Sequence, residues 1–238
     1  MKTLFLLLAL ALPAAADPLD DVRTRARPEL LKPLALDLGG VIGATGFHNG
    51  QPLGFPGFEL GLVGATQFKP DQDNLIFRDA GVKAFGVPML HGAVGLPLKF
   101  DIVGHGLKIG DGHVIGGGVR YCIFKSGKTT LPIPSVGVSV FGDAVNPSAF
   151  TASHYAFNVG ASWHTPIVSP FLGAGWDLTE IKVRDATAAS AIGAKATARG
   201  SRLTGGVDVT PFPFLRLRGA AMLLHGIPGM SISIGAKF

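Results

Sequence analysis

The chain has 238 residues, of which 47% are apolar and 16% are charged, and its mean hydropathy is +0.39. Beyond residue 16 no stretch holds 18 consecutive apolar residues, and the 34 Gly and 17 Pro weaken helix interiors, so a helical membrane protein is disfavoured. The net charge of +5 is scattered, without a basic patch interleaved with aromatic residues, which argues against nucleic-acid binding.

Residues 1–16 have the pattern of a secretory signal peptide. Lys2 is the only charge before Asp17, the stretch between them is apolar, and it ends on three alanines, Ala14 to Ala16. This stretch is too short to span a bilayer as a helix. We therefore expect export and cleavage after Ala16, with a mature chain that starts at Asp17.

Residues 17–33 differ from the rest of the chain. Asp17 and Pro18 resemble a helix cap followed by a first-turn proline, whereas Pro28 and Pro33 would end any helix soon afterwards. We predict a short periplasmic segment here. Two roles stay open: it plugs a lumen, or it hangs free.

From Leu34 onward, apolar residues recur with a period close to two, which is typical of strands. The pattern gives eleven strand candidates: 34–47, 58–68, 82–94, 99–109, 113–124, 133–142, 153–164, 170–181, 199–209, 214–224 and 230–238. Bacterial single-chain membrane barrels usually have an even number of strands. We therefore expect ten or twelve strands, with the error in residues 34–98, where Pro88 and Pro97 interrupt the alternation.

The clearest strand candidate shows what the alternation means. Tyr155, Phe157, Val159, Ala161 and Trp163 fall on one face, and His154, Ala156, Asn158, Gly160 and Ser162 on the other. A soluble sandwich would alternate in the same way, but its water-facing side would carry more Lys and Glu. The polar faces here hold mainly small residues. An all-β fold is predicted, a single transmembrane antiparallel barrel over residues 34–238 with its apolar face toward lipid.

The C-terminal nonapeptide strengthens this prediction. Met230, Ile232, Ile234, Ala236 and Phe238 share one face, and the chain stops on the aromatic ring. In lipid the last strand must pair with the first, because no strand edge can be left open. We interpret Phe238 as part of an outer-membrane assembly signal at the periplasmic end. The links at 225–229, 183–198, 143–152, 110–112 and about 69–81 would then lie at the outer end.

Several segments, in their order along the chain, resemble a functionally uncharacterised family of Gram-negative outer-membrane β-barrel proteins. They are 86–97 (GVPMLHGAVGLP), 107–113 (LKIGDGH), 117–121 (GGVRY), 170–176 (PFLGAGW) and the terminal Phe238. The resemblance implies a fold and a location, an outer-membrane barrel exported through a cleaved signal peptide. It implies no activity and no functional residue.

Charged residues on the non-lipid faces should line the lumen, because an Arg or Lys facing lipid at mid-depth costs about 2–4 kcal/mol. We place Arg120, Asp177, Asp208, Arg216 and Arg218 there. A turn at 210–213 would set Asp208 opposite Arg216 across two antiparallel strands. A filled charge network would give a rigid closed barrel, and a hydrated one would give a pore.

No motif supports catalysis, a cofactor or a metal. His105 and His113 flank a turn but lack a placed carboxylate, and residues 71–74 lack the later glycine and glutamate of a calcium loop. Gly127-Lys128-Thr129 has Cys122 where a phosphate-binding loop needs glycine. His154 has Ser148 and Ser153 nearby in sequence, a pairing that is common by chance. Cys122 is interpreted as a small buried filler. We therefore predict that the protein is not an enzyme.

Three functions remain open. The sequence narrowly favours a narrow pore or transport barrel for an unidentified small solute, since small residues on the inner faces leave space. The alternatives are a closed structural or surface-interaction barrel and, least favoured, a barrel enzyme. The expected partners are outer-membrane lipid and the barrel-assembly machinery, which would bind the C-terminal strand, together with a small solute.

Overall fold

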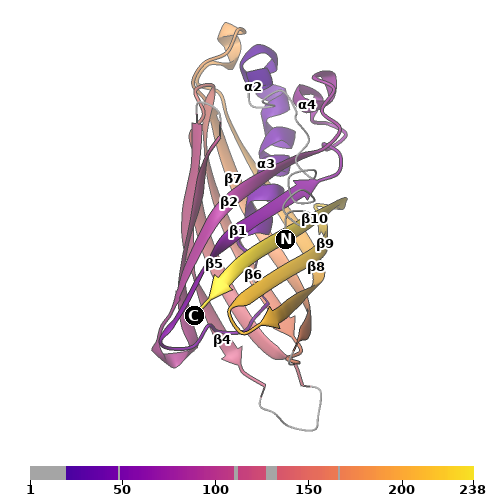
Figure 1. Ribbon diagram of the computed structural model, residues 1–238. Coiled ribbons are helices and arrows are strands. Elements are labelled where there is room, and N and C mark those ends of the chain that lie inside the picture. Colours follow the sequence, from indigo (N-terminus) through magenta and orange to yellow (C-terminus); the bar gives the residue numbers. More distant parts are fainter. Residues whose placement is uncertain (1–19, 48, 110–111, 127–132, 166) are drawn as a thin grey trace, which may run out of the picture.

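The fold is a closed antiparallel barrel of ten strands, seen in a computed structural model that describes residues 20–238 except 48, 110–111, 127–132 and 166 (Figure 1). Each strand pairs with its neighbours in sequence, and β10 closes the ring on β1. The strands are β1 (Gly57–Gln67), β2 (Phe85–Gly95), β3 (Phe100–Ile109), β4 (Gly112–Phe124), β5 (Ser135–Val145), β6 (Phe150–Ser162), β7 (Val168–Val183), β8 (Lys195–Phe212), β9 (Leu215–Leu224) and β10 (Ile227–Lys237).

Ring closure involves the C-terminal residue directly. Phe238 exchanges two backbone hydrogen bonds with Phe58, of 2.9 and 2.8 Å, at the start of β1. The predicted pairing of last strand with first is thus confirmed, and the predicted count of ten or twelve strands is met by ten. Residues 1–16, the predicted signal peptide, lie outside the described residues.

The first of the eleven strand candidates, 34–47, is wrong. Residues Leu31–Thr45 form helix α3, preceded by α2 (Asp20–Arg25) and the 3-10 turn η1 (Pro28–Leu30), so the barrel wall begins at Gly57 and not at Leu34. Pro33 lies in the first turn of α3, where a missing N–H costs little. None of the helices in the described part of the chain is long and apolar enough to cross a membrane.

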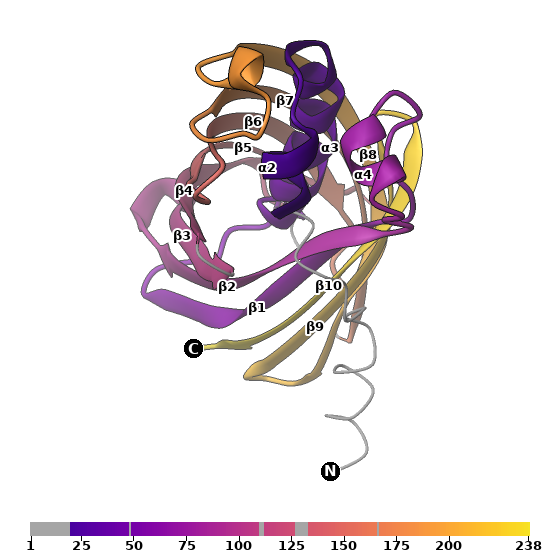
Figure 2. The same ribbon diagram turned by 90° about the horizontal axis from the view of Figure 1, so that it is seen from above.

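Helix α3 lies inside the ring of strands, as the view down the barrel shows (Figure 2). Leu31, Leu34, Val41 and Ile42 are almost completely buried, and the helix packs mainly on β7 and β8 and also on β1 and β6. A helix that is buried nearly all round must be surrounded by protein. Eight strands are just filled by side chains, and in this wider barrel α3 occupies the additional space.

The outer surface of the wall is apolar and exposed. Leu60 is 66% exposed, Tyr155 60% and Trp176 50%, whereas His154 and Ser162 on the alternate positions of β6 are fully buried. The predicted facing of this strand is therefore confirmed. Large apolar side chains all round an exposed wall are expected of a barrel that crosses a lipid bilayer.

The N-terminal helices and the C-terminal residue lie at opposite ends of the barrel (Figure 1). Arg23 of α2 pairs with Asp185, in the link between β7 and β8, at 2.8 Å, and α2 also contacts α4 (Leu75–Asp79), in the link between β1 and β2. Phe238 pairs at the other end, where β1 starts. The predictions that Phe238 and residues 17–33 are both periplasmic therefore cannot both hold.

Candidate functional site

The candidate site is the lumen, where buried charged side chains connect helix α3 with the barrel wall. All five predicted lumen charges lie on its inner side, together with charged residues that the sequence did not single out. Three clusters can be distinguished along the barrel.

The first cluster surrounds Asp37, which is fully buried on α3. Its carboxylate accepts hydrogen bonds from Gln67 Nε2 at 2.7 Å, Asn74 Nδ2 at 2.7 Å and the backbone N of Asp71 at 2.9 Å, and His225 Nε2 lies 3.0 Å away. These donors come from the end of β1, the link after it and the turn between β9 and β10. One carboxylate therefore fastens α3 to three separate parts of the barrel.

The second cluster is a chain of alternating acidic and basic side chains from strands β3, β5, β6 and β7. Asp143 on β5 lies between His105 and His154, with His154 Nδ1 at 2.8 Å, and His154 Nε2 is 3.0 Å from Asp177 Oδ1. Ionised carboxylates only accept hydrogen bonds, so both ring nitrogens of His154 must donate. His154 therefore bridges Asp143 and Asp177, one carboxylate at each ring nitrogen.

Arg202 on β8 continues this chain. Its Nε and Nη2 bind Asp177 at 2.7 and 3.0 Å, and Nη2 also donates to Asn158 Oδ1 at 2.8 Å. Bidentate pairing of this kind is the strong form of an Arg–carboxylate contact. Arg202 is 1% exposed.

Glycines of α3 lie directly on these charged groups. A Cβ on Gly43 would contact Asp177 Oδ1 and would come within 2.8 Å of Arg202 Nη2, and a Cβ on Gly39 would contact Thr179 Oγ1. Gly39 and Gly43 are four residues apart and so share one helix face. That face has no side chains, which lets the helix backbone pack on the charged wall.

The third cluster lies nearer the C-terminal end. Arg218 binds Asp208 through Nε at 2.7 Å and Nη2 at 3.1 Å, and Asn49 Nδ2 also donates to this carboxylate. Arg216 binds Glu59 Oε2 at 2.8 Å.

The predicted register of β8 and β9 is wrong by two residues, because Asp208 lies opposite Arg218 and not Arg216. An irregularity in the pairing between Val209 and Phe212 shifts the strands near the turn. Arg216 Nη2 is 3.9 Å from Asp208 Oδ2, so it remains a secondary neighbour.

Arg120 is the least satisfied of the buried cations. Its Nη2 lies 3.3 Å from His91 Nε2, whereas Nε and Nη1 have no partner among the described residues. Asp101 is directly across the strand pair from Arg120, but its carboxylate accepts from the backbone N of Leu53 at 3.0 and 3.2 Å.

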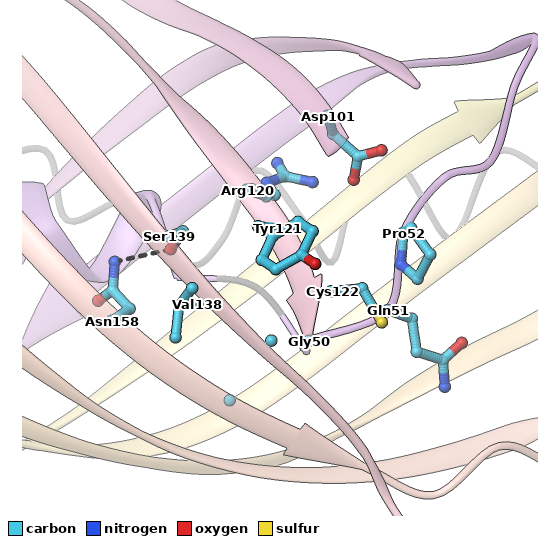
Figure 3. Close-up of a pocket in the computed structure, with 12 residues that line it drawn as sticks. Gly50, Gln51, Pro52, Asp101, Arg120, Tyr121, Cys122, Val138, Ser139 and Asn158 are labelled. Carbon is cyan, nitrogen blue, oxygen red and sulfur yellow. Dashed lines mark hydrogen bonds between the residues drawn. The ribbon is translucent and has the colours of Figure 1, made fainter. Parts of the chain in front are cut away.

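Two cavities between the buried charged side chains are small, and a wider cleft of about 180 Å³, lined in part by Asp208 and Arg216, lies at the C-terminal end. A cavity beside residues 50–52 has a volume of about 10 Å³, and a second, between Arg120 and Arg218, about 20 Å³ (Figure 3 shows the first). Each has room for about one water molecule. Around the two small cavities the network is filled, a state that the sequence could not distinguish from a hydrated one.

In the rejected catalytic and metal-binding motifs that involve histidine, the side chains lie apart from one another in the structure. His105 binds Asp143 inside the barrel, whereas His113 lies exposed near the start of β4, with its Nε2 3.3 Å from Asn146 Nδ2. Ser153 is exposed and points away from the buried His154 that follows it. Across the described residues no group of three or more His, Cys, Asp or Glu side chains is placed to hold a metal ion. The Gly127 triplet lies outside the described residues.

Sequence reasoning missed Asp37, Asp143 and the role of His154 as the centre of a chain. His154 was placed on the inner face of its strand, and Asp143, which lies directly opposite it, could have been placed there by its own strand position. Asp37 could not be found in this way, because residues 34–47 were predicted to be a strand of the wall and not a helix inside it.

Comparisons with known proteins find only distant structural similarity. No family model matches the chain, and no curated protein matches it. The solved structures similar to this chain are outer-membrane barrels of Gram-negative bacteria among others. The N-terminal β-barrel domain of Pseudomonas aeruginosa OprF has 10% identity and a TM-score of 0.40, covering 76% of this chain and 97% of its own.

Two other structures have similar values. Neisserial surface protein A has 14% identity and a TM-score of 0.32, covering 76% of this chain and 95% of its own. The transport unit of the autotransporter AIDA-I from Escherichia coli has 11% identity and a TM-score of 0.37, covering 90% of this chain and 99% of its own. Likeness at this level carries no argument about activity or partners.

Proposed function

We propose that this chain is an outer-membrane barrel whose lumen is closed by its own N-terminal helix, and that it serves as a closed structural or surface-interaction barrel. The observation that carries the proposal is the attachment of α3 through Asp37. A loosely held plug would not need a fully buried carboxylate with donors from three parts of the wall. The proposal assigns no enzymatic step.

The location is part of the proposal. The apolar exposed wall requires a lipid environment, and the predicted signal peptide favours export. In the outer membrane, Phe238 would face the periplasm, where the assembly machinery would bind β10. Helices α2 and α4 and the link between β7 and β8 would then face the cell exterior, where they could bind another surface.

Labelling of intact bacteria tests location and orientation together. Single cysteines would be introduced at Ser190, in the link between β7 and β8, and at Thr165, in the link between β6 and β7 at the other end, each with Cys122→Ser. Both positions are exposed. A membrane-impermeant maleimide should label the Ser190 variant in intact cells and the Thr165 variant only after lysis. The reverse order would invert the orientation, and recovery in the soluble fraction would refute the membrane location.

A second function, transport of a small solute, is favoured by one observation. The wall around α3 carries His105, Asp143, Asp177 and Arg202, which would be readily hydrated if the helix left. A barrel filled only for stability could use apolar side chains there. If the barrel transports a solute, α3 would act as a gate that leaves the lumen to open it.

Liposome swelling with a neutral sugar tests transport. Gly43→Leu places a side chain where Asp177 and Arg202 lie and should displace α3. Faster swelling than with the wild type would support a gated conduit. If the variant barrel stays assembled, protease cleaves the freed α3 and the sugar still does not enter, the transport function is excluded.

A further inference from the structure

Two small cavities near the C-terminal end of the lumen are lined by buried hydrogen-bond donors that have no partner among the described residues. We define the arginine cavity as the space lined by Arg120, Arg216, Arg218, Glu59, His91 and Ser233, with a volume of about 20 Å³. We define the loop cavity as the space of about 10 Å³ on the other side of Arg120, beside Gln51 and Asp101 (Figure 3). Arg120 lines both.

The unpartnered buried polar side-chain atoms that line these two cavities, among the described residues, are all donors. They are Arg120 Nε, Arg120 Nη1 and Gln51 Nε2. A guanidinium cannot accept a hydrogen bond and stays protonated. Whatever satisfies Arg120 must therefore be an acceptor, which leaves a water molecule or an anion.

Charge balance favours an anion. Three arginines and one carboxylate, Glu59, line the arginine cavity. Glu59 is bound by Arg216, and the partner of Arg218 is Asp208, which lies outside the cavity lining. Among the described residues no carboxylate lies within ion-pair distance of Arg120, and Glu59 and Asp101 attract its charge only from farther away. A buried charge without a close partner is destabilising.

Nearby acidic groups do not supply this charge. Asp101 is the cross-strand neighbour of Arg120, but its two oxygens face the backbone N of Leu53, and no ion pair joins it to Arg120. His91 Nε2 is near both Arg120 and Glu59, at 3.3 and 3.5 Å, and a single ring nitrogen cannot accept from one and donate to the other. The cavity is too small for a phosphate or a carboxylic acid.

We propose that the arginine cavity binds one chloride ion, held by Arg120 with support from Arg216 and Arg218. An entry path is available at the C-terminal end. A cleft of about 180 Å³ lined by His164, Arg216 and Lys237 shares Arg216 with the arginine cavity. Asp208 also lines this cleft and is bound by Arg218, so Arg216 and Lys237 are the side chains there that would attract an anion. The cavity is also lined by Thr45, the last residue of α3, and by Phe47, so the proposal requires α3 in its place in the barrel.

Bromide replaces chloride and is visible by anomalous scattering. Crystals of the full chain in detergent, soaked in sodium bromide, should show an anomalous peak within hydrogen-bond distance of the Arg120 guanidinium. A water molecule there without bromide signal, or bromide only at the Lys237 rim, would overturn the proposal.

Thermal unfolding gives an independent readout. Replacing sodium chloride by sodium gluconate at equal ionic strength should lower the midpoint of wild-type unfolding by about 2–4 °C, the size expected from about 1 kcal/mol of lost stabilisation. Arg120→Met should abolish this difference, and Arg199→Met, at an exposed position on β8, should keep it. Equal midpoints of the wild type in both salts would contradict the proposal. If Arg120→Met does not fold, the wild-type anomalous map decides alone.

Discussion

At the scale of single residues, Asp37 is the side chain on which the closed state depends most. Asp37→Ala would remove the acceptor of Asn74 Nδ2 and of one N–H of Gln67 Nε2, whose other hydrogen bond, to the Lys69 carbonyl, remains. Each unsatisfied buried donor costs about 1–3 kcal/mol, so we expect a loss of about 3 kcal/mol in the free energy of unfolding. The measurement is the temperature at which the folded band disappears in heat-modifiability electrophoresis.

The matched control is Asp73→Ala, which removes an exposed carboxylate from the same link. It should change the unfolding temperature little, because surface substitutions are usually within about 0.5 kcal/mol. Equal losses for the two variants would mean that Asp37 does not fasten α3.

At the scale of elements, helix α3 shows where sequence analysis reached its limit. Leu34, Leu36 and Leu38 alternate as in a strand, yet Leu31, Leu34, Leu38 and Ile42 also recur at helical spacing. The two periods coincide over these few residues, and Gly39 and Gly40 favour neither. Packing on the charged wall decides in favour of the helix. These contacts join residues far apart in the chain, so the local sequence pattern does not reveal them. Strands β1 to β10 were predictable because apolar residues, which face outward, alternate in the sequence with small or polar residues, which face the barrel interior.

The glycine face of α3 makes a prediction at this scale. Gly43→Ala should lower stability by about 1–3 kcal/mol, because its Cβ meets Asp177 and Arg202, and overpacking of a filled interior is destabilising. Gly64→Ala on β1 is the control, since its Cβ meets no atom within 4 Å. Comparison of the two unfolding temperatures checks this. A Gly43→Ala variant as stable as Gly64→Ala would show that α3 is not packed on the wall as described.

The register of β8 and β9 can be measured with disulfides. Cysteines at Asp208 and Arg218 should cross-link on oxidation in a Cys122→Ser background, because directly opposite residues have Cβ atoms about 4.5–5.5 Å apart. Cysteines at Asp208 and Arg216 are diagonal neighbours and should cross-link less. Gel mobility under non-reducing conditions gives both yields. If cysteines at Asp208 and Arg216 cross-link more than those at Asp208 and Arg218, the register that the sequence predicted from the 210–213 turn would be correct.

At the scale of the whole molecule, the wall separates a lipid-facing surface from a filled interior. A cysteine at Tyr155 should react with a lipid-soluble maleimide, whereas one at the buried Asn158 should react with neither a lipid-soluble nor a water-soluble reagent. Ready reaction of the Asn158 variant with the water-soluble reagent would show a hydrated lumen. The sequence was sufficient to place charged residues on the inner face of the barrel. It was not sufficient to predict their ion-pair partners, because these depend on the strand register and on the position of α3.

The central claim is that α3 closes the barrel, and conductance of the purified full chain in a planar bilayer tests it most directly. With α3 fastened at Asp37 and cavities no larger than about 20 Å³ between the arginines, the wild type should insert without steady ionic current. A stable, reproducible conductance from the wild-type chain would contradict the account.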